Sequence, residues 1–416
     1  MKRMIYAVVF VLAMAAVAHA GFVIDTVEEG DTGYFTEIAL TSDDRPGICY
    51  LNKDNYAAHY AEWTGAAWET ETVDADGNVG SNCGIFFDAA DDPHMAYRDD
   101  GDGKVRYAAW DGDSWNIRVI DKAFPTGTGL AVAHDGDYWL RTASVQTNVE
   151  EIAYTYMNAI GPHTKYVGGD LYTIGGEALG LAVTPDGQSI VSWYYPDTNC
   201  RAMWLARGHT AGWDFKLVDG DESWDVIGRY SDVQVDATGG IHLVYLNEDK
   251  GALYYARGTW NNLHTDQMVT GVGTSFDQSL DGDGNPHVCF VHEASGALLY
   301  ANLNDKGWWH IYKVDDAAGR DCSLAVDSAG VVTIAYRGAH PSPLFVARGD
   351  ESGLPDLGGD DDDDATDDDA SDDDVGPGDD DASGDDDATD DDEAADDDDT
   401  AGDDDTSGDD DMFCGC

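Results

Sequence analysis

Four arginines could supply the chemistry of an anion-binding site: Arg98, Arg229, Arg320 and Arg337. Each falls at the end of a predicted strand or in a loop between strands. A guanidinium binds a carboxylate through two parallel hydrogen bonds, so arginines that converge would fit an acidic ligand. The residues that could complete such a ligand site are Tyr194, Tyr195, Glu248, His292, Glu293 and His340. The four arginines do not share positions in the repeat of the chain, and surface ion pairs with acidic residues are the alternative.

The same residues could support catalysis on carbohydrates. A glycoside hydrolase needs two carboxylates at a defined separation across the scissile bond, and a polysaccharide lyase needs a base such as His292. Acidic residues are so abundant here that no pair can be singled out. The chain contains no nucleophile motif, phosphate-binding glycine loop or zinc-ligand spacing. We therefore favour binding without chemistry and assign no catalytic residue.

Three histidines, His94, His242 and His287, share one position, three residues before an aromatic that closes a strand. A lyase base or a metal ligand is one interpretation. Repetition at equivalent places would spread these histidines around a ring, so we favour a repeated structural role.

Calcium is the one cofactor that the sequence suggests. Residues 74–78 (DADGN) and 281–285 (DGDGN) place oxygen ligands on alternate residues, as hard cations prefer. Neither segment has a full twelve-residue calcium loop. Both also lie where the chain must turn, and we favour plain turns.

A repeat of about 45 residues organises the middle of the chain. We call the residue at which the first, apolar strand of a unit ends its anchor. Nine residues after each anchor, an aromatic residue usually closes a second strand, with Thr142 as the exception. The anchors lie 47, 45, 51, 52, 45 and 46 residues apart, at Thr41, Asp88, Ala133, Thr184, Asp236, Asp281 and Asp327. Period-2 alternation then predicts a third and a fourth strand in each unit, the size of a propeller blade.

The seventh unit lacks its fourth strand, which the N-terminus can supply. Residues 22–27 align with the fourth strand of the second unit, residues 115–120. Pairing them with the last unit would close a ring and remove an exposed sheet edge. We predict an all-β fold, a seven-bladed β-propeller over residues 21–350 closed by the N-terminal strand. A pair of β-sandwiches or an open solenoid is the alternative.

The cysteines fit this repeat. Cys49 and Cys289 lie one residue before a second-strand aromatic, while Cys83 and Cys322 lie five residues before an anchor. We predict the disulfides Cys49–Cys83 and Cys289–Cys322, with free thiols as the alternative. Cys200, in a predicted loop, has no partner in the body.

The repeats resemble those of sialidase-type propellers, known as BNR or Asp-box-like repeats, across about Phe22 to Arg348. The resemblance rests on a D-x-x-G-x-x-H-x-x-Y pattern, as from Asp236 to Tyr245, and on a Y-A-x-W-x-G-x-x-W pattern from Tyr107 to Trp115. It implies the fold, and a function among glycosidases, lyases and lectins. The strict Asp-box frame is degraded, and the start motif of sialidases is absent.

Charge and the two ends of the chain indicate its location. Residues 1–20 have a positive start, an apolar run and Ala18-His19-Ala20, so they predict a secretory signal peptide, with a membrane anchor as the alternative. Residues 351–411 are Asp-rich and predict a disordered linker. Residues 412–416 end in two cysteines and resemble a surface-sorting tail. The net charge of −61 disfavours nucleic acid and anionic membranes.

We therefore predict a secreted or cell-surface monomer that binds glycans or another surface polymer, with Tyr194, Tyr195 and Trp224 suited to stacking on sugars. A glycoside hydrolase or polysaccharide lyase is one alternative. A structural surface spacer is the other. Peripheral attachment to the outer surface would use the C-terminal cysteines.

Overall fold

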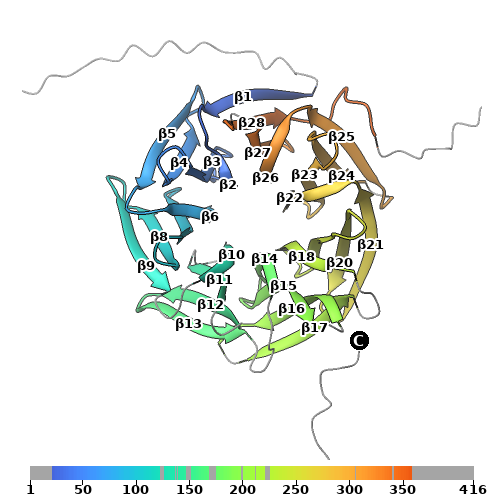
Figure 1. Ribbon diagram of the computed structural model, residues 1–416, viewed down its shortest axis with the longest axis horizontal. Helices are drawn as coiled ribbons and strands as arrows, with labels where there is room; N and C mark the ends of the chain where they lie inside the picture. Colours follow the sequence, from blue (N-terminus) through green and yellow to red (C-terminus); the bar gives the residue numbers. More distant parts are fainter. Residues whose placement is uncertain are drawn as a thin grey trace, which may run out of the picture. The chain divides into compact units, whose positions relative to one another are not determined.

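Seven four-stranded antiparallel sheets form a closed β-propeller (Figure 1). The computed structural model describes residues 21–357 except 122–125, 136, 138, 147–150, 168–174, 198–199, 211, 221–224, 305 and 340–341. The first strand of each blade lies nearest the centre, and the last lies at the rim (Figure 1). Within these residues there is no helix long and apolar enough to cross a membrane.

The strands follow the chain in order, blade by blade. Blade 1 comprises β2 (Tyr34–Leu40), β3 (Pro46–Asn52), β4 (Ala57–Trp63) and β5 (Trp68–Asp74). Blade 2 comprises β6 (Val79–Phe87), β7 (Pro93–Asp99), β8 (Lys104–Trp110) and β9 (Trp115–Asp121). Blade 3 comprises β10 (Thr126–His134), β11 (Leu140–Gln146), β12 (Glu151–Asn158) and β13 (Gly161–Val167). Blade 4 comprises β14 (Gly175–Val183), β15 (Ser189–Asp197), β16 (Cys200–Gly208) and β17 (Trp213–Asp219).

The last three blades include the one that closes the ring. Blade 5 comprises β18 (Ile227–Val235), β19 (Ile241–Asn247), β20 (Ala252–Thr259) and β21 (Asn262–Thr270). Blade 6 comprises β22 (Val272–Leu280), β23 (Pro286–His292), β24 (Leu298–Leu303) and β25 (Trp309–Asp315). Blade 7 comprises β26 (Ala318–Val326), β27 (Val332–Gly338), β28 (Leu344–Gly349) and β1 (Phe22–Glu28).

The N-terminal strand completes blade 7, as predicted. β1 pairs antiparallel with β28, with Ile24 opposite Ala347 and Thr26 opposite Phe345. The first and last parts of the propeller are thereby hydrogen-bonded to each other. The fold class predicted from the repeat is confirmed.

The hydrophobic core lies between blades. One cluster joins Cys49 and Tyr60 of blade 1 to Met95 and Tyr97 of blade 2. The second strand of a blade faces a neighbouring blade on each side, which explains why every residue of β3, β11 and β19 is buried. Apolar surface that is removed from water contributes about 25 cal/mol per Å² to stability, so each interface between blades favours closure of the ring.

The repeat frame of blade 3 needs a correction. Val132 pairs with Thr142 and Leu130 with Ser144. This register matches that of the other blades only if the anchor lies two residues later than Ala133. The anchor is Asp135, whose N–H bonds the carbonyl of Trp139 as the other anchors close their hairpins. The sequence prediction was wrong here because the apolar run ends at Ala133, whereas the strand continues through the polar His134.

Both predicted disulfides are present. Cys49 and Cys83 have Cα atoms 6.2 Å apart, and Cys289 and Cys322 have Cα atoms 6.4 Å apart. Each bond joins the second strand of one blade to the first strand of the next. Cys200 begins β16 rather than lying in a loop, and its side chain lies outside the described part of the chain.

Candidate functional site

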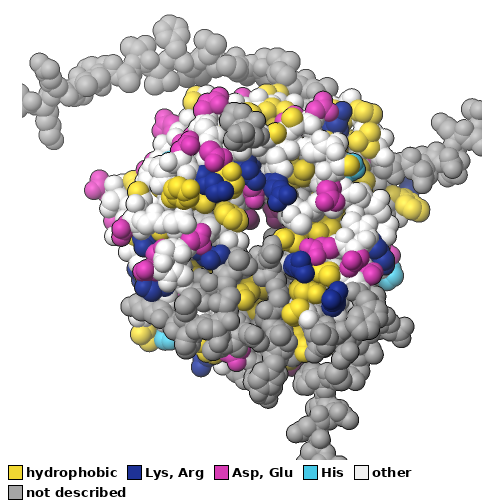
Figure 2. Space-filling model, in the orientation of Figure 1, with side chains coloured by type: hydrophobic (Ala, Val, Ile, Leu, Met, Phe, Trp, Pro, Cys, Tyr) yellow, Lys and Arg dark blue, Asp and Glu magenta, His cyan; other side chains and the backbone are white. Residues whose placement is uncertain are grey.

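Three of the four arginines expected to bind a ligand are each paired with a carboxylate. The N–O distances are 2.7 Å for Arg337–Asp321, 2.9 Å for Arg98–Asp100 and 3.2 Å for Arg229–Glu248. Arg320 is exposed and lies opposite Arg337 across β26 and β27. Figure 2 shows one face of the propeller, on which Lys and Arg side chains lie around the central opening. The acidic partners neutralise three of these cations locally, so the structure does not gather a set of unpaired arginines.

The prediction that the arginines do not occupy equivalent positions was wrong. Arg229 and Arg320 both lie seven residues before their anchors, and Arg98 and Arg337 both lie ten residues after theirs. The register of blades 2 and 7 confirms the second pair, since Ser81 faces Arg98 as Arg320 faces Arg337. The equivalence was hidden because other residue types fill these positions in the remaining blades.

Of the other predicted ligand residues, the structure brings Tyr194 and Glu248 together at Arg229. Tyr194 is only 3% exposed, with the Arg229 guanidinium 5.7 Å from the centre of its ring, so the ring does not present a free face. His292 bonds Ser295 through Nδ1 at 2.9 Å, Glu293 is exposed, and Tyr195 is half-buried. His340 and Trp224 lie outside the described residues.

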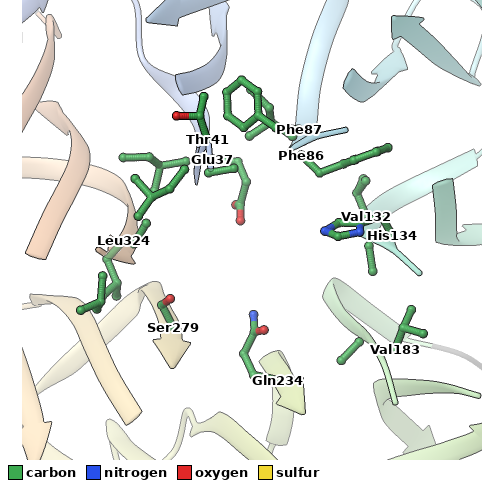
Figure 3. Close-up of a pocket in the computed structure, with 18 of the residues that line it drawn as sticks. Glu37, Thr41, Phe86, Phe87, Val132, His134, Val183, Gln234, Ser279 and Leu324 are labelled. Carbon is green, nitrogen blue, oxygen red and sulfur yellow. The ribbon is translucent and has the colours of Figure 1, made fainter. Parts of the chain in front are cut away.

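The central channel contains a cavity of about 680 Å³. Glu37 and Gln234 point toward each other across it (Figure 3). Glu37 and Asp277 also line a second part of the channel, together with Asp232. Among the described residues that line these two parts there is neither Lys nor Arg.

The channel carboxyls hold protons more tightly than ordinary ones. Burial raises the pKa of Glu37 well above its usual range, and the nearby Asp277 and Asp232 raise it further. Burial likewise raises the pKa values of Asp232 and Asp277. Asp277 accepts hydrogen bonds from the Ser323 hydroxyl and the Leu324 N–H of the next blade, both at 2.9 Å. Asp277 therefore links blades 6 and 7. The raised pKa values mean that the channel carries less negative charge than the sequence suggests.

The repeated histidines connect strands within a blade, as expected of a structural role. The Nδ1 atoms of His94, His242 and His287 lie 2.5, 2.6 and 2.6 Å from a tyrosine hydroxyl of the third strand. Their Nε2 atoms lie 3.3–3.6 Å from the anchor aspartate. Burial lowers the pKa of all three imidazoles, which favours the neutral form. In blade 3, Arg141 bonds both Asp135 and Tyr154 from the same position.

A groove between blades 1 and 2 combines aromatic and carboxylate side chains. Its volume is about 390 Å³, and we call it the Trp110 groove. It is lined by Tyr60, Glu62, Glu69, Thr70, Glu71, Pro93 and Trp110.

The strand register places four of these residues on one face of blade 1. Tyr60 lies opposite Glu71, and Glu62 lies opposite Glu69, across β4 and β5. Residues two apart on a strand point the same way, so all four side chains share a face. The Tyr60 ring meets the ring of Trp115 in blade 2, with centroids 5.6 Å apart, which shows that this face is turned toward blade 2.

Blade 2 supplies the opposite wall. The rings of Trp110 and Trp115 make an edge contact with centroids 5.6 Å apart, and the Trp115 Nε1–H donates to Glu71 Oε1 at 2.8 Å. This hydrogen bond ties the aromatic wall to the carboxylate wall. Burial, followed by the charge of Glu62, raises the pKa of Tyr60, so its phenol keeps its proton.

The groove is suited to a polar ligand with apolar faces. A half-buried indole offers a flat apolar surface. Ionised carboxylates accept up to four hydrogen bonds each and can bind hydroxyl or ammonium groups. A sugar ring has both features.

A second groove occupies the corresponding place between blades 4 and 5. Its volume is about 330 Å³, and its lining includes Gln188, Arg207, Trp260 and Asn261. The Arg207 guanidinium lies 4.6 Å from the centre of the Trp260 ring and 3.0 Å from Asp214. This Trp260 groove combines an aromatic ring with an ion pair.

The two predicted calcium segments form turns. Asp281 Oδ1 accepts the backbone N–H groups of Asp283 and Asn285, and Asp74 Oδ1 accepts that of Asp76. Among the described residues, no group of three or more His, Cys, Asp or Glu side chains is arranged to hold a metal ion.

The fold is shared with known propellers, whereas two comparisons of the sequence found no match. No protein-family model matches the chain, and neither does any curated protein. AofleA from Arthrobotrys oligospora is 14% identical with a TM-score of 0.51, covering 71% of this chain and 89% of that chain. The fucose-specific lectin from Aleuria aurantia is 12% identical with a TM-score of 0.50, covering 69% of this chain and 97% of that chain. Similarity at this identity shows a common fold alone.

Sequence reasoning missed the Trp110 groove, although a signal existed. Glu62, Glu69 and Glu71 belong to predicted neighbouring strands of one blade, and their spacing places them on one face. Recognising the groove also required knowing that the third strand of the next blade, with Trp110 at its end, packs over that face.

Proposed function

We propose that this protein is a secreted carbohydrate-binding β-propeller that holds a glycan or a similar surface polymer in the Trp110 groove without chemical conversion. The observation that carries the proposal is the groove itself, where Trp110 faces a row of carboxylates on an adjacent blade. The shared fold adds support, because the Aleuria aurantia protein is named as a fucose-specific lectin.

Secretion and surface display are part of the proposal. The signal peptide expected at residues 1–20 and the two cystines suit an oxidising compartment. The Asp-rich linker would hold the propeller away from an attachment point at the C-terminal cysteines. The predicted ligand residues around the central opening, such as Arg320, stay candidates for a further contact with a long polymer.

A glycan array probed with the mature protein tests this function. We expect binding to a defined set of glycans, with no released product on incubation. By calorimetry, Trp110→Ala should weaken binding of the best ligand at least about tenfold, since stacking and wall contacts are worth roughly 1–3 kcal/mol. Trp308→Ala is the matched control, because Trp308 is 69% exposed and lies in blade 6. Equal loss in both variants, or released product, would count against the proposal.

A further inference from the structure

A like-charge pair distinguishes blade 1 from every other blade. Glu62 and Glu69 face each other directly across β4 and β5, and Glu71 follows on the same face. Like charges directly opposite in a sheet are destabilising. The described residues that line the Trp110 groove include no Lys or Arg. Arg45, on a nearby turn, is close enough to act on Tyr60 but is not part of this lining.

The corresponding cross-strand position in the other six blades holds no pair of acidic residues. All fourteen residues at this position are described, so the comparison is complete. The pairs are Ala109/Asn116, Tyr156/His163, Arg207/Asp214, Arg257/His264, Asn302/His310 and Val23/Arg348. Blade 4 has an attractive pair, with Arg207 3.0 Å from Asp214. The fold therefore does not require a repulsive pair here.

Because these facing acids line a groove with an aromatic wall and have no counterpart in the other blades, we propose that Glu62, Glu69 and Glu71 recognise the ammonium group of an amino sugar, so that the ligand of the Trp110 groove is a glycan with free primary amines. The inference rests on the proposed function and names its ligand class. Charge-assisted hydrogen bonds from an ammonium to carboxylates are about twice as strong as neutral ones. The Trp110 ring would contact the sugar and attract its cation.

An organic cation suits the groove better than a metal ion. Within the described part of the chain these carboxylates do not form a group able to ligate a metal. One wall is aromatic, and Glu71 already accepts the Trp115 Nε1–H at 2.8 Å. The net charge of −61 would also draw polycations toward the protein and repel anionic polysaccharides.

Two tetrasaccharides that differ only in N-acetylation test the ligand class. We would titrate the mature protein with the glucosamine tetramer and the N-acetylglucosamine tetramer by calorimetry at pH 6, in low salt with EDTA. We expect the amine form to bind at least about tenfold more tightly, with affinity that falls as salt rises. Glu69→Gln should weaken binding of the amine form far more than binding of the acetylated form, so that most of this preference is lost.

Asp214→Asn is the matched control, because it removes one carboxylate from the equivalent position of blade 4; the preference should persist. Without ligand, Glu69→Gln should raise the melting temperature, since it relieves the Glu62–Glu69 repulsion. Equal affinity for the two tetramers, with binding that Trp110→Ala abolishes, would overturn this inference and leave the proposed function standing. If neither tetramer binds, the inference is overturned, and other glycans decide the function. If the preference for the amine form is seen without EDTA but disappears when EDTA is present, a bridging metal is indicated. That result would also overturn the inference.

Discussion

The Tyr336 hydroxyl donates a 2.7 Å hydrogen bond to Asp315 Oδ2, which joins the second strand of blade 7 to the end of the rim strand of blade 6. The same contact recurs at three other interfaces. The equivalent pairs are Tyr50–Glu28 at 2.6 Å, Tyr97–Asp74 at 2.9 Å and Tyr245–Asp219 at 2.8 Å. The strand-closing tyrosines of the repeat therefore fasten adjacent blades together.

The exceptions support this function. Val167 and Val269 replace the acid at the rim of blades 3 and 5, and the next blades carry Trp193 and Phe290, which lack a hydroxyl. Where the acceptor is missing, the donor is missing too. This clamp between a tyrosine and a rim carboxylate is thus present or absent as a pair at six interfaces. At the interface of blades 2 and 3 the acid Asp121 is kept, but it accepts a 2.8 Å hydrogen bond from Gln146 Nε2 instead of one from a tyrosine.

Removing one hydroxyl tests the clamp. Tyr336→Phe should lower the free energy of unfolding by about 1.5–3 kcal/mol, because the bond to a charged acceptor is lost and Asp315 stays half-buried. Phe290→Tyr is the complementary change: its new hydroxyl faces Val269, so this variant should also be destabilised. Urea denaturation measures both. A neutral Tyr336→Phe variant would show that the bond does not fasten the interface.

The protonated channel carboxyls predict a pH dependence of stability. Glu37, Asp232 and Asp277 have pKa values above the ordinary value of about 4. The folded state then binds more protons than the unfolded state, so their stabilisation is complete below about pH 4 and is lost as pH rises through the neutral range. The melting-temperature advantage of Asp232→Asn over wild type should grow from pH 5 to pH 8. Asp25→Asn, on the exposed rim, controls for net charge; identical pH curves for both variants would refute this explanation.

The two cystines should stabilise the ring. Each closes a loop of about 35 residues, for which chain entropy predicts roughly 3–4 kcal/mol. Replacing Cys49 and Cys83 together by Ala should lower the melting temperature by several degrees, and replacing the second pair should add to the loss. An oxidised protein with the same melting temperature as its reduced form would contradict this expectation.

A glycine eight residues before the anchor marks a close contact between blades. Gly80 has φ of +105°, and a Cβ there would lie 2.8 Å from the Cα of Ala58. Gly65 has φ of +90° with no atom within 4 Å of a Cβ, so it is the matched control. Gly65→Ala should cost roughly 1–2 kcal/mol from backbone strain, and Gly80→Ala a further 1–3 kcal/mol or so from overpacking. Equal losses would mean that the contact at Ala58 relaxes freely.

The repeat predicted the fold far better than the site. Spacing and alternation were enough for the seven blades, the closing strand and both cystines, because those features depend on local pattern and on register. The anchor of blade 3 was misplaced, since the apolar run ends at Ala133 while the strand continues through His134. The Trp110 groove and the Tyr336–Asp315 clamp were missed because each joins strands of adjacent blades, and a single repeat shows only one side of such a contact.

Glycan binding between blades 1 and 2 is the central claim, and the indole N–H signals of the tryptophans report on it most directly. The protein is labelled with ¹⁵N, Trp110 and Trp260 are assigned by Phe substitution, and the best array ligand is titrated by NMR. We predict saturable shifts at Trp110 and Trp115, with the Trp260 signal unchanged. Binding that shifts other signals while Trp110 and Trp115 stay fixed would contradict the assignment of this groove.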